Sequence, residues 1–183
     1  MKHTAITHRF NDLGRRQRGA SLLEAIAYLG IAAVVILGAV SMLNSAFNSA
    51  QANRVTEQLI SIRTGVKKLF MGRVGNYGTV DFTAAAVNAG IFPSTIATSS
   101  TTGSATNDWS GAVKIVGNTG TFTISYEAVP RDICIAAISG ATGWTEIAVG
   151  TDAGSKINTF PVSPVAANTA CNAASNTISL SSN

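Results

Sequence analysis

The stretch LLEAIAYLGIAAVVILGAVSML, residues 22–43, decides the fold, because it is long, apolar and carries one charged residue, Glu24. A helix needs roughly 20 apolar residues to cross a hydrocarbon core about 30 Å thick, and this stretch meets that requirement. Its many alanine and glycine residues favour close packing between helices. Three arginines, at positions 15, 16 and 18, precede it, and a basic N-terminal flank keeps that end in the cytoplasm. We therefore expect the chain after this stretch to be exported.

Glu24 is unusual in this position, because a carboxylate in a membrane span costs about 3 kcal/mol at its centre and less near the interface. If the chain were cut between Gly19 and Ala20, the new α-amino group would lie four residues before Glu24, one helical turn away. The amine and the carboxylate could then neutralise each other, within one chain or between neighbours. Between neighbours such a pair fixes the axial register, because a mispaired buried charge is costly.

The residues leave three interpretations of this N-terminus open. In the first, residues 1–18 begin a secretory signal that is cleaved after Ala46 or Ala50. Against it, the apolar run exceeds the roughly 7–15 residues of a signal-peptide core and contains an acid. In the second, the stretch is a plain signal anchor with a solvated, interfacial Glu24. In the third, a basic leader is removed before the apolar helix rather than after it.

The third interpretation is supported by a resemblance. Residues 19–30, GASLLEAIAYLG, resemble the processing motif of type IV prepilins: a glycine before the cut, an acid at the fifth mature position and an apolar helix. The 19-residue leader is similar in length to the leaders of the type IVb group. Within that group the chain most resembles the thin-pilus major pilins of conjugative plasmids and their enterobacterial relatives. The stretches GNYG at 75–78, after the long helix, and NDWSG at 107–111, before the expected sheet, extend the resemblance.

The resemblance implies an α+β pilin fold, in which a long N-terminal helix over about residues 20–72 packs on a C-terminal antiparallel β-sheet. The corresponding domains are a leader (1–19), a hydrophobic helix that serves as membrane anchor and filament core (20–46), and an exported pilin head (47–183) that includes the amphipathic half of the helix. We expect the precursor in a bacterial inner membrane with its head in the periplasm, and the assembled protein in an extracellular pilus.

The resemblance also implies roles for individual residues and for partners. A prepilin peptidase is expected to cleave between Gly19 and Ala20, after which Ala20 is N-methylated and Glu24 acts in assembly and register. The subunit would polymerise with copies of itself, with the help of an assembly ATPase and an inner-membrane platform protein. Such a pilus serves adhesion, aggregation or conjugative mating. The alternatives are a minor pilin or type II secretion pseudopilin and, from another class, a monomeric membrane-anchored periplasmic binding protein or hydrolase.

The total charge is misleading once the leader is set aside. The chain has a formal charge of +4 and a pI near 9.4. The first 19 residues hold five of the 13 Lys and Arg and one of the nine Asp and Glu, so the rest carries eight of each sign. The positive charge that could suggest a nucleic-acid partner lies in the leader, which is expected to be removed. We therefore expect no nucleic-acid partner. A neutral head is weakly protected against self-association, which suits a subunit that packs with copies of itself.

Cys134 and Cys171 both lie in the exported part. In an oxidising compartment an even pair favours a disulfide. Closing a loop of this size should stabilise the head by about 4 kcal/mol. The sequence has no C-x-x-C motif, which argues against a redox role.

The helix is expected to continue past the apolar stretch, because no proline interrupts residues 20–72 and the first stop signal is Gly72. Apolar residues recur there at spacings of 4, 3, 4 and 3 residues, on one helical face: Val55, Leu59, Ile62, Val66 and Leu69. The stripe is short for a coiled coil, so we expect it to pack on the chain's own sheet. The other faces hold Arg63, Lys67, Lys68 and Arg73, which form either a solvated polar face or a polyanion site.

Beyond Tyr77 the pattern changes to short elements. Residues 81–89 predict a short helix with Asp81 as its N-cap and an end at Gly90. Strand-like runs follow at 112–117, 121–129, 132–138, 144–149 and 176–181. Two segments rich in Ser, Thr, Asn, Ala and Gly, 94–107 and 163–183, are interpreted either as exposed loops and edges or as flexible chain.

Little in the sequence indicates an enzyme. Both histidines, His3 and His8, lie in the leader, so the mature chain lacks Ser-His, Cys-His and histidine–metal sites. Glu127 and Asp132 flank a turn and could form a carboxylate pair, although two exposed turn acids explain them more simply. We therefore expect no catalytic residues, no cofactor and no metal site.

Overall fold

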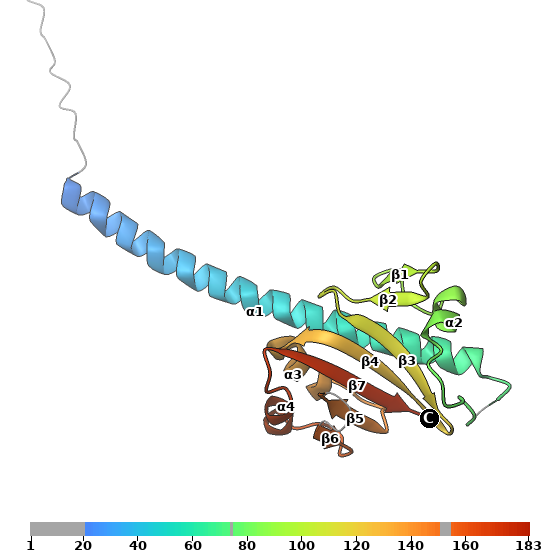
Figure 1. The fold of residues 1–183 in the computed structure, drawn as a ribbon. Helices are drawn as coiled ribbons and strands as arrows, with labels where there is room; N and C mark the ends of the chain where they lie inside the picture. The colour runs from blue at the N-terminus through green and yellow to red at the C-terminus, as the bar shows by residue number, and fades with distance from the viewer. Residues whose placement is uncertain (1–20, 74, 151–154) are drawn as a thin grey trace, which may run out of the picture. The chain divides into compact units, whose positions relative to one another are not determined.

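The computed structural model describes residues 21–73, 75–150 and 155–183. In chain order the elements are α1 (Leu22–Leu69), α2 (Thr83–Asn88), β1 (Ala97–Ser99), β2 (Ser104–Thr106), β3 (Ala112–Asn118), β4 (Thr121–Pro130), α3 (Arg131–Ser139), β5 (Glu146–Val149), β6 (Ser155–Ile157), α4 (Pro164–Ala170) and β7 (Ser175–Ser182) (Figure 1). The chain divides into two compact units between Met42 and Leu43, and α1 contributes to both. We refer to the second unit as the head.

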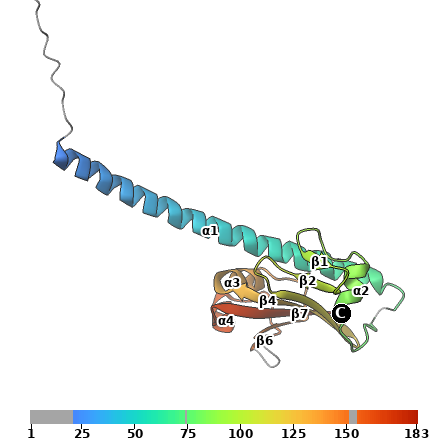
Figure 2. The same ribbon diagram turned by 45° about the horizontal axis from the view of Figure 1, so that its top comes forward.

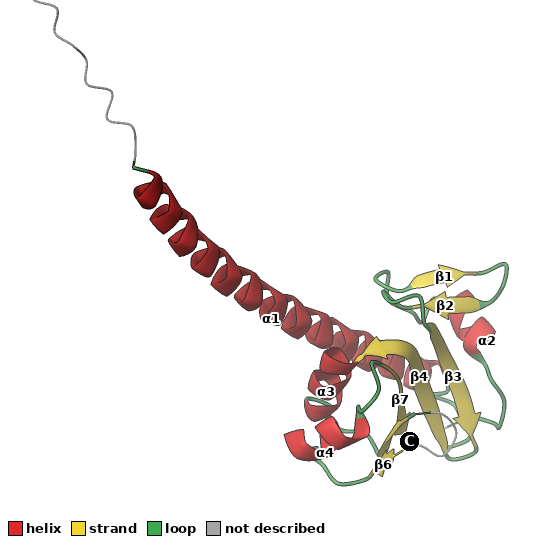
Figure 3. Cartoon of the chain, turned by 60° about the vertical axis from the view of Figure 1, so that its left-hand side comes forward, coloured by secondary structure: helices red, strands yellow, loops and turns green. Residues whose placement is uncertain are grey.

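The strands form one antiparallel sheet in the order β1-β2-β3-β4-β7-β5-β6. Strand β7 lies between β4 and β5 near the middle of the sheet (Figure 1). Figure 3 shows β7 beside β4 from another side. The long N-terminal helix and the antiparallel sheet confirm the predicted α+β pilin architecture.

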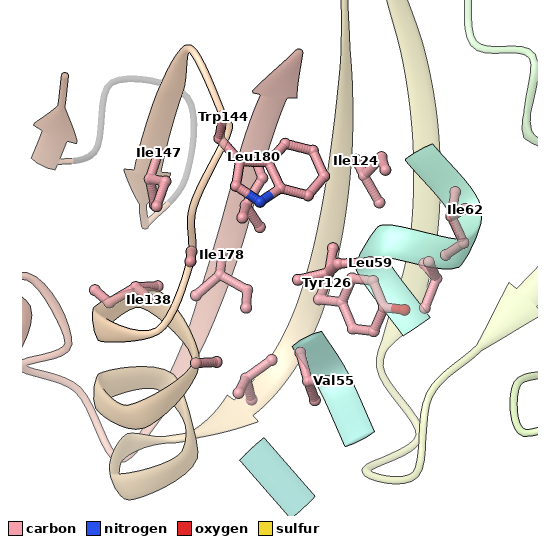
Figure 4. Packing of buried hydrophobic residues seen from close by; sticks show 14 of the residues in the cluster. Val55, Leu59, Ile62, Ile124, Tyr126, Ile138, Trp144, Ile147, Ile178 and Leu180 are labelled. Carbon is pink, nitrogen blue, oxygen red and sulfur yellow. The ribbon is translucent and has the colours of Figure 1, made fainter. Parts of the chain in front are cut away.

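The predicted apolar stripe of α1 is the helix's contribution to the core of the head. Val55, Leu59, Ile62 and Val66 are buried, whereas Leu69 is 48% exposed, so the buried stripe ends one turn earlier than the spacing predicts. Figure 4 shows Val55, Leu59 and Ile62 beside the inward side chains of the sheet. The expectation that this face packs on the chain's own sheet is therefore confirmed.

The two central strands alternate between buried and partly exposed residues, as half-buried strands must. In β4 the buried positions are Phe122, Ile124, Tyr126 and Val129. Opposite Ile124 and Tyr126 on β7 stand Leu180 and Ile178. The register shifts between Tyr126 and Val129, where Ala128 has a φ of 59°. This bulge interrupts the regular pairing, which resumes at Val129 and Pro130 just before α3.

Residues 132–138, predicted as a strand, form helix α3 instead. The buried residues of α3 are Ile133, Cys134, Ala137 and Ile138, which recur at helical rather than alternating spacing. Pro130 occupies the N-cap, and Asp132 lies in the first turn, where a negative charge is favourable. The β-branched residues of the segment favoured the wrong prediction.

Helices α2 and α3 lie at opposite ends of the sheet (Figure 2). The short helix α2 packs beside β2 and β3 and ends, as predicted, just before Gly90, whose φ is +66°. Its N-cap residue is Phe82 rather than Asp81. Asp81 still accepts a hydrogen bond from the Thr83 amide at 2.8 Å.

The interpretation of segment 94–107 as exposed loops and edges agrees with the structure in part, because the segment contains the edge strand β1 and its neighbour β2. It is wrong for segment 163–183, which contains α4 and the central strand β7. Ser163 caps α4, accepting a hydrogen bond from the Ala166 amide at 3.2 Å, and Pro164 follows it in the first turn. Serine followed by proline is a helix-start signal that the sequence already carried.

Candidate functional site

The candidate site begins at the N-terminal end of α1. The predicted cleavage residues, Gly19 and Ala20, lie outside the described residues. Glu24 lies in the first turn of α1, where the unpaired amides of the helix favour a negative charge. The hydroxyl of Tyr28, one turn later, donates a hydrogen bond to Glu24 Oε1 at 3.2 Å.

The half of α1 in the first unit has an apolar surface that is exposed in the single chain. Its 18-residue window of highest mean hydropathy, 2.4, has no buried residue. Thirteen large apolar side chains from position 22 to position 43 are exposed: Leu22, Leu23, Ile26, Tyr28, Leu29, Ile31, Val34, Val35, Ile36, Leu37, Val40, Met42 and Leu43. By length and composition this helix could cross a membrane. An exposed apolar surface of this extent needs a membrane or a partner to cover it.

Small residues interrupt this apolar surface. A Cβ added at Gly30 or at Gly38 would meet no atom within 4 Å. Both positions are therefore open to the side chains of an approaching helix, which is the role of small residues in packed membrane helices.

In the head, the predicted disulfide joins Cys134 and Cys171, whose Cα atoms are 6.0 Å apart. Cys134 lies in α3 and Cys171 at the C-cap of α4, and both residues are fully buried. The bond therefore fixes two helices to each other at one end of the sheet.

The stretch NDWSG lies between β2 and β3, inside the sheet connection rather than before the sheet. Asn107 organises it: its side-chain oxygen accepts from the amides of Trp109 and Gly111 at 3.0 and 2.8 Å. Its amide nitrogen donates to the Glu127 carbonyl at 2.7 Å. A Cβ at Gly111 would overlap that carbonyl, so the close approach of the loop to β4 requires glycine.

The stretch GNYG follows α1 and holds the end of β3. The Tyr77 amide donates to the Thr119 carbonyl at 2.8 Å, and the ring is buried against Phe70 and Phe122. Gly75 and Gly78 adopt φ values of +80° and +74°, which glycine reaches without strain. The two stretches that extend the family resemblance, residues 75–78 and 107–111, therefore both have structural roles in the head.

Arg63 is a residue whose role the sequence did not reveal. It was assigned to a solvated face or a polyanion site, but its Nε donates to Ser182 Oγ at 3.0 Å. Its guanidinium also lies 5.1 Å from the centroid of the Trp144 ring, in cation–π geometry. Arg63 thus joins α1 to β7 and to the segment before β5, contacts that helical spacing could not indicate.

The carboxylates that could have formed a catalytic pair have separate partners. Glu127 pairs with Lys114 at 2.6 Å, and the hydrogen bond and charge of Glu127 raise the pKa of that lysine. Asp132 accepts a hydrogen bond from Asn48 at 3.5 Å. Within residues 21–73, 75–150 and 155–183, no group of three His, Cys, Asp or Glu residues could hold a metal ion.

The family model and the solved structures that match this chain agree with each other. The model of the PilS N-terminal family matches residues 49–183. A type IV b pilin from Salmonella typhi aligns with a TM-score of 0.54 and 21% identity, over 70% of this chain and 96% of that one. TcpA, a type IV pilin from the Vibrio cholerae El Tor biotype, aligns with a TM-score of 0.52 and 13% identity, over 74% of this chain and 99% of that one. No curated protein matches the sequence.

Proposed function

Because the chain belongs to the PilS family of type IV pilins, we propose that it is the major structural subunit of a type IVb pilus. The observation that supports this proposal most strongly is the exposed apolar half of α1, which begins with an acid in its first turn. An exposed apolar surface of this extent is unfavourable in water, whereas packing in a filament core would bury it. The two pilins compared above share the fold and are structural proteins, not enzymes.

The proposed maturation removes residues 1–19. A prepilin peptidase cleaves between Gly19 and Ala20, and the amine of Ala20 is then methylated. Before assembly the apolar helix holds the subunit in the inner membrane, with the head in the periplasm. An assembly ATPase and an inner-membrane platform protein then draw subunits into the extracellular filament, which serves adhesion, aggregation or conjugative mating.

The proposed assembly contact joins Glu24 of one subunit to the Ala20 amine of a neighbour. Glu24 is exposed in the single chain, and its hydrogen bond to Tyr28 leaves one carboxylate oxygen free of described partners. In an apolar filament core both charges need an opposite charge nearby, because an unpaired buried charge is costly. Only one axial offset between two helices satisfies both, so the pair selects the register.

Mass spectrometry of the N-terminus of the purified protein tests the maturation. We expect a chain that begins at Ala20 and carries a methyl group on its amine. A chain that begins after Ala46 or Ala50 would identify a secretory signal and refute the pilin assignment. A chain that keeps the arginines before position 19 would indicate a signal anchor. Sheared surface fibres in which this chain dominates would distinguish a major from a minor pilin.

Replacing Glu24 tests the assembly contact. We expect Glu24→Ala to lower the yield of surface filaments about 100-fold or more, because breaking a buried ion pair costs about 3–5 kcal/mol. Cleavage after Gly19 should continue. The matched control is Tyr28→Phe, which removes the hydrogen bond to Glu24 but keeps the carboxylate, and should assemble normally. Normal filament yield from Glu24→Ala would rule out the register role.

A further inference from the structure

A groove in the head holds an acid without a partner. It lies between α1 and the segment before β1, has a volume of about 700 Å³, and is lined by Phe47, Arg54, Glu57, Pro93 and Thr95 among others. Arg54 in its wall already pairs with Asp108 at 3.0 Å. Glu57 is exposed, and no hydrogen bond or ion pair joins its carboxylate to another described residue. Because Asp108 pairs with Arg54, the groove keeps one unpaired negative charge, that of Glu57, which a cationic side chain would complement.

The same helix carries an excess of cations near its C-terminal end. Lys67 and Lys68 lie in the last turn of α1, and Arg73 follows the helix. All three are exposed, and in the described parts of the chain none of them forms an ion pair. Lys67 follows Arg63 by four residues, a like-charge spacing that is unfavourable on a helix. Partial burial and the Arg63 guanidinium lower the pKa of Lys67. An anion from outside the chain would relieve this repulsion.

The acid and one of these lysines lie on the same face of α1. Lys68 follows Glu57 by 11 residues, which is about three turns at 3.6 residues per turn and about 16 Å along the axis. Between them this face carries the short polar side chains of Ser61 and Thr64, which let another helix approach closely. Two parallel copies of α1 offset by three turns would therefore bring Lys68 of one copy to Glu57 of the other.

From this arrangement we propose that the groove at Glu57 receives Lys68 from a second copy of this chain. The inference rests on the proposed function, because only a polymer of parallel subunits repeats such an offset from copy to copy. Each interior head would then use its acid toward one neighbour and its lysine toward the other. The contact lies in the head and joins a different pair of copies from the Glu24 contact, because a Glu24–Ala20 pair between parallel helices needs an offset of about 6 Å rather than about 16 Å.

Charge reversal in the full-length chain tests this contact. Glu57→Lys and Lys68→Glu should each lower the yield of sheared filaments by about tenfold, because like charges then face each other. The double variant Glu57→Lys with Lys68→Glu restores opposite charges and should recover most of the yield. Thermal unfolding of each variant, purified in detergent, should match the unaltered chain, because both side chains are exposed.

Cysteine cross-linking gives the direct readout. Filaments of the double variant Glu57→Cys with Lys68→Cys should form a ladder of covalent multimers on oxidation, whereas each single variant should not. The matched control replaces Lys114, on β3, instead of Lys68 and should give no ladder.

Different results would overturn the Glu57–Lys68 contact and the proposed function. Filaments from the unaltered chain, together with normal yields from both charge reversals or no ladder from the cysteine pair, would overturn the Glu57–Lys68 contact alone. A double reversal that stays as defective as the single variants would also overturn it. No filaments from the unaltered, correctly processed chain would overturn the proposed function and this contact with it.

Discussion

Tyr126 is the largest side chain that the head buries completely. Its hydroxyl donates to Gln58 Oε1 at 3.5 Å, and the Gln58 amide donates to Thr95 Oγ1 at 3.0 Å. This chain of three residues links β4, α1 and the segment before β1. It also satisfies two polar side chains in an otherwise apolar core, where an unpaired polar group is costly.

The buried hydroxyl of Tyr126 makes the head sensitive to alkali. Burial, with the charge of Asp108 as a smaller cause, raises the pKa of this tyrosine far above its ordinary value of about 10. Above pH 10 the unfolded chain loses the proton while the folded chain keeps it, so folding is disfavoured as the pH rises. We expect the free energy of unfolding to fall by up to about 1.4 kcal/mol per pH unit in this range. Chemical denaturation from about pH 8 to about pH 11 measures the slope.

The variant Tyr126→Phe is the control for this slope. It removes the titrating group and the hydrogen bond to Gln58 but keeps the ring in the core. Its stability should be lower near neutral pH and should fall less steeply above pH 10 than that of the unaltered chain. Equal alkaline slopes for the two proteins would show that Tyr126 does not titrate on unfolding.

At the scale of elements, α3 and α4 depend on each other. They are short, and both the Cys134–Cys171 bond and direct packing connect them. Helices of this length are marginal in water without tertiary contacts. The disulfide therefore holds in place two elements that local propensity alone would not form.

Removing the disulfide should destabilise the head. Replacing Cys134 and Cys171 by alanine together should lower the free energy of unfolding by about 4 kcal/mol on the chain-entropy model. Urea denaturation of the two proteins measures the difference. The double variant is preferable to a reductant, because both cysteines are fully buried and reduction would be slow. Identical denaturation midpoints would contradict a stabilising role for the bond.

The helices and strands whose apolar residues recur at a regular spacing were predictable from the sequence. The stripe of α1 and the alternation in β3, β4 and β7 follow from side chains that face one core. The prediction failed at α3, where residues with β-branched side chains form a helix whose buried positions only the tertiary packing defines. It also missed β1, β2 and β6, which have three residues each and too few positions to show any period.

Only part of the candidate site was predictable from the sequence. The apolar stretch and its acid can be recognised from residue types alone, because membrane length and charge are properties of composition. The pairing of the only two cysteines is similarly constrained. The roles of Arg63 and Gln58 were not predictable, because each depends on partners more than 30 residues away in the chain.

At the scale of the whole molecule, the continuity of the sheet in the head depends on the position of β7. The final strand pairs with β4 on one side and β5 on the other, so the sheet is not continuous without it. Its side chains Ile178 and Leu180 also belong to the main core. The C-terminal residues are therefore part of the centre of the head rather than an appendage.

Truncation tests this central position. Deleting residues 175–183 should prevent the head from folding, because it removes two strand pairings and part of the core. Protein yield and protease resistance report the loss. Deleting Asn183 alone is the matched control and should leave the stability unchanged, because that residue is exposed and follows the strand. A protease-resistant head without β7 would contradict the topology.

Strand β7 follows both of its sheet partners, β4 and β5, in the chain. A ribosome therefore synthesises β4 and β5 before the strand that joins them. Until that strand arrives, β4 and β5 present unpaired edges, which invite wrong pairings with other chains. The sheet of the head therefore closes only after β7 has been synthesised, because β7 alone joins β4 to β5 among the described strands.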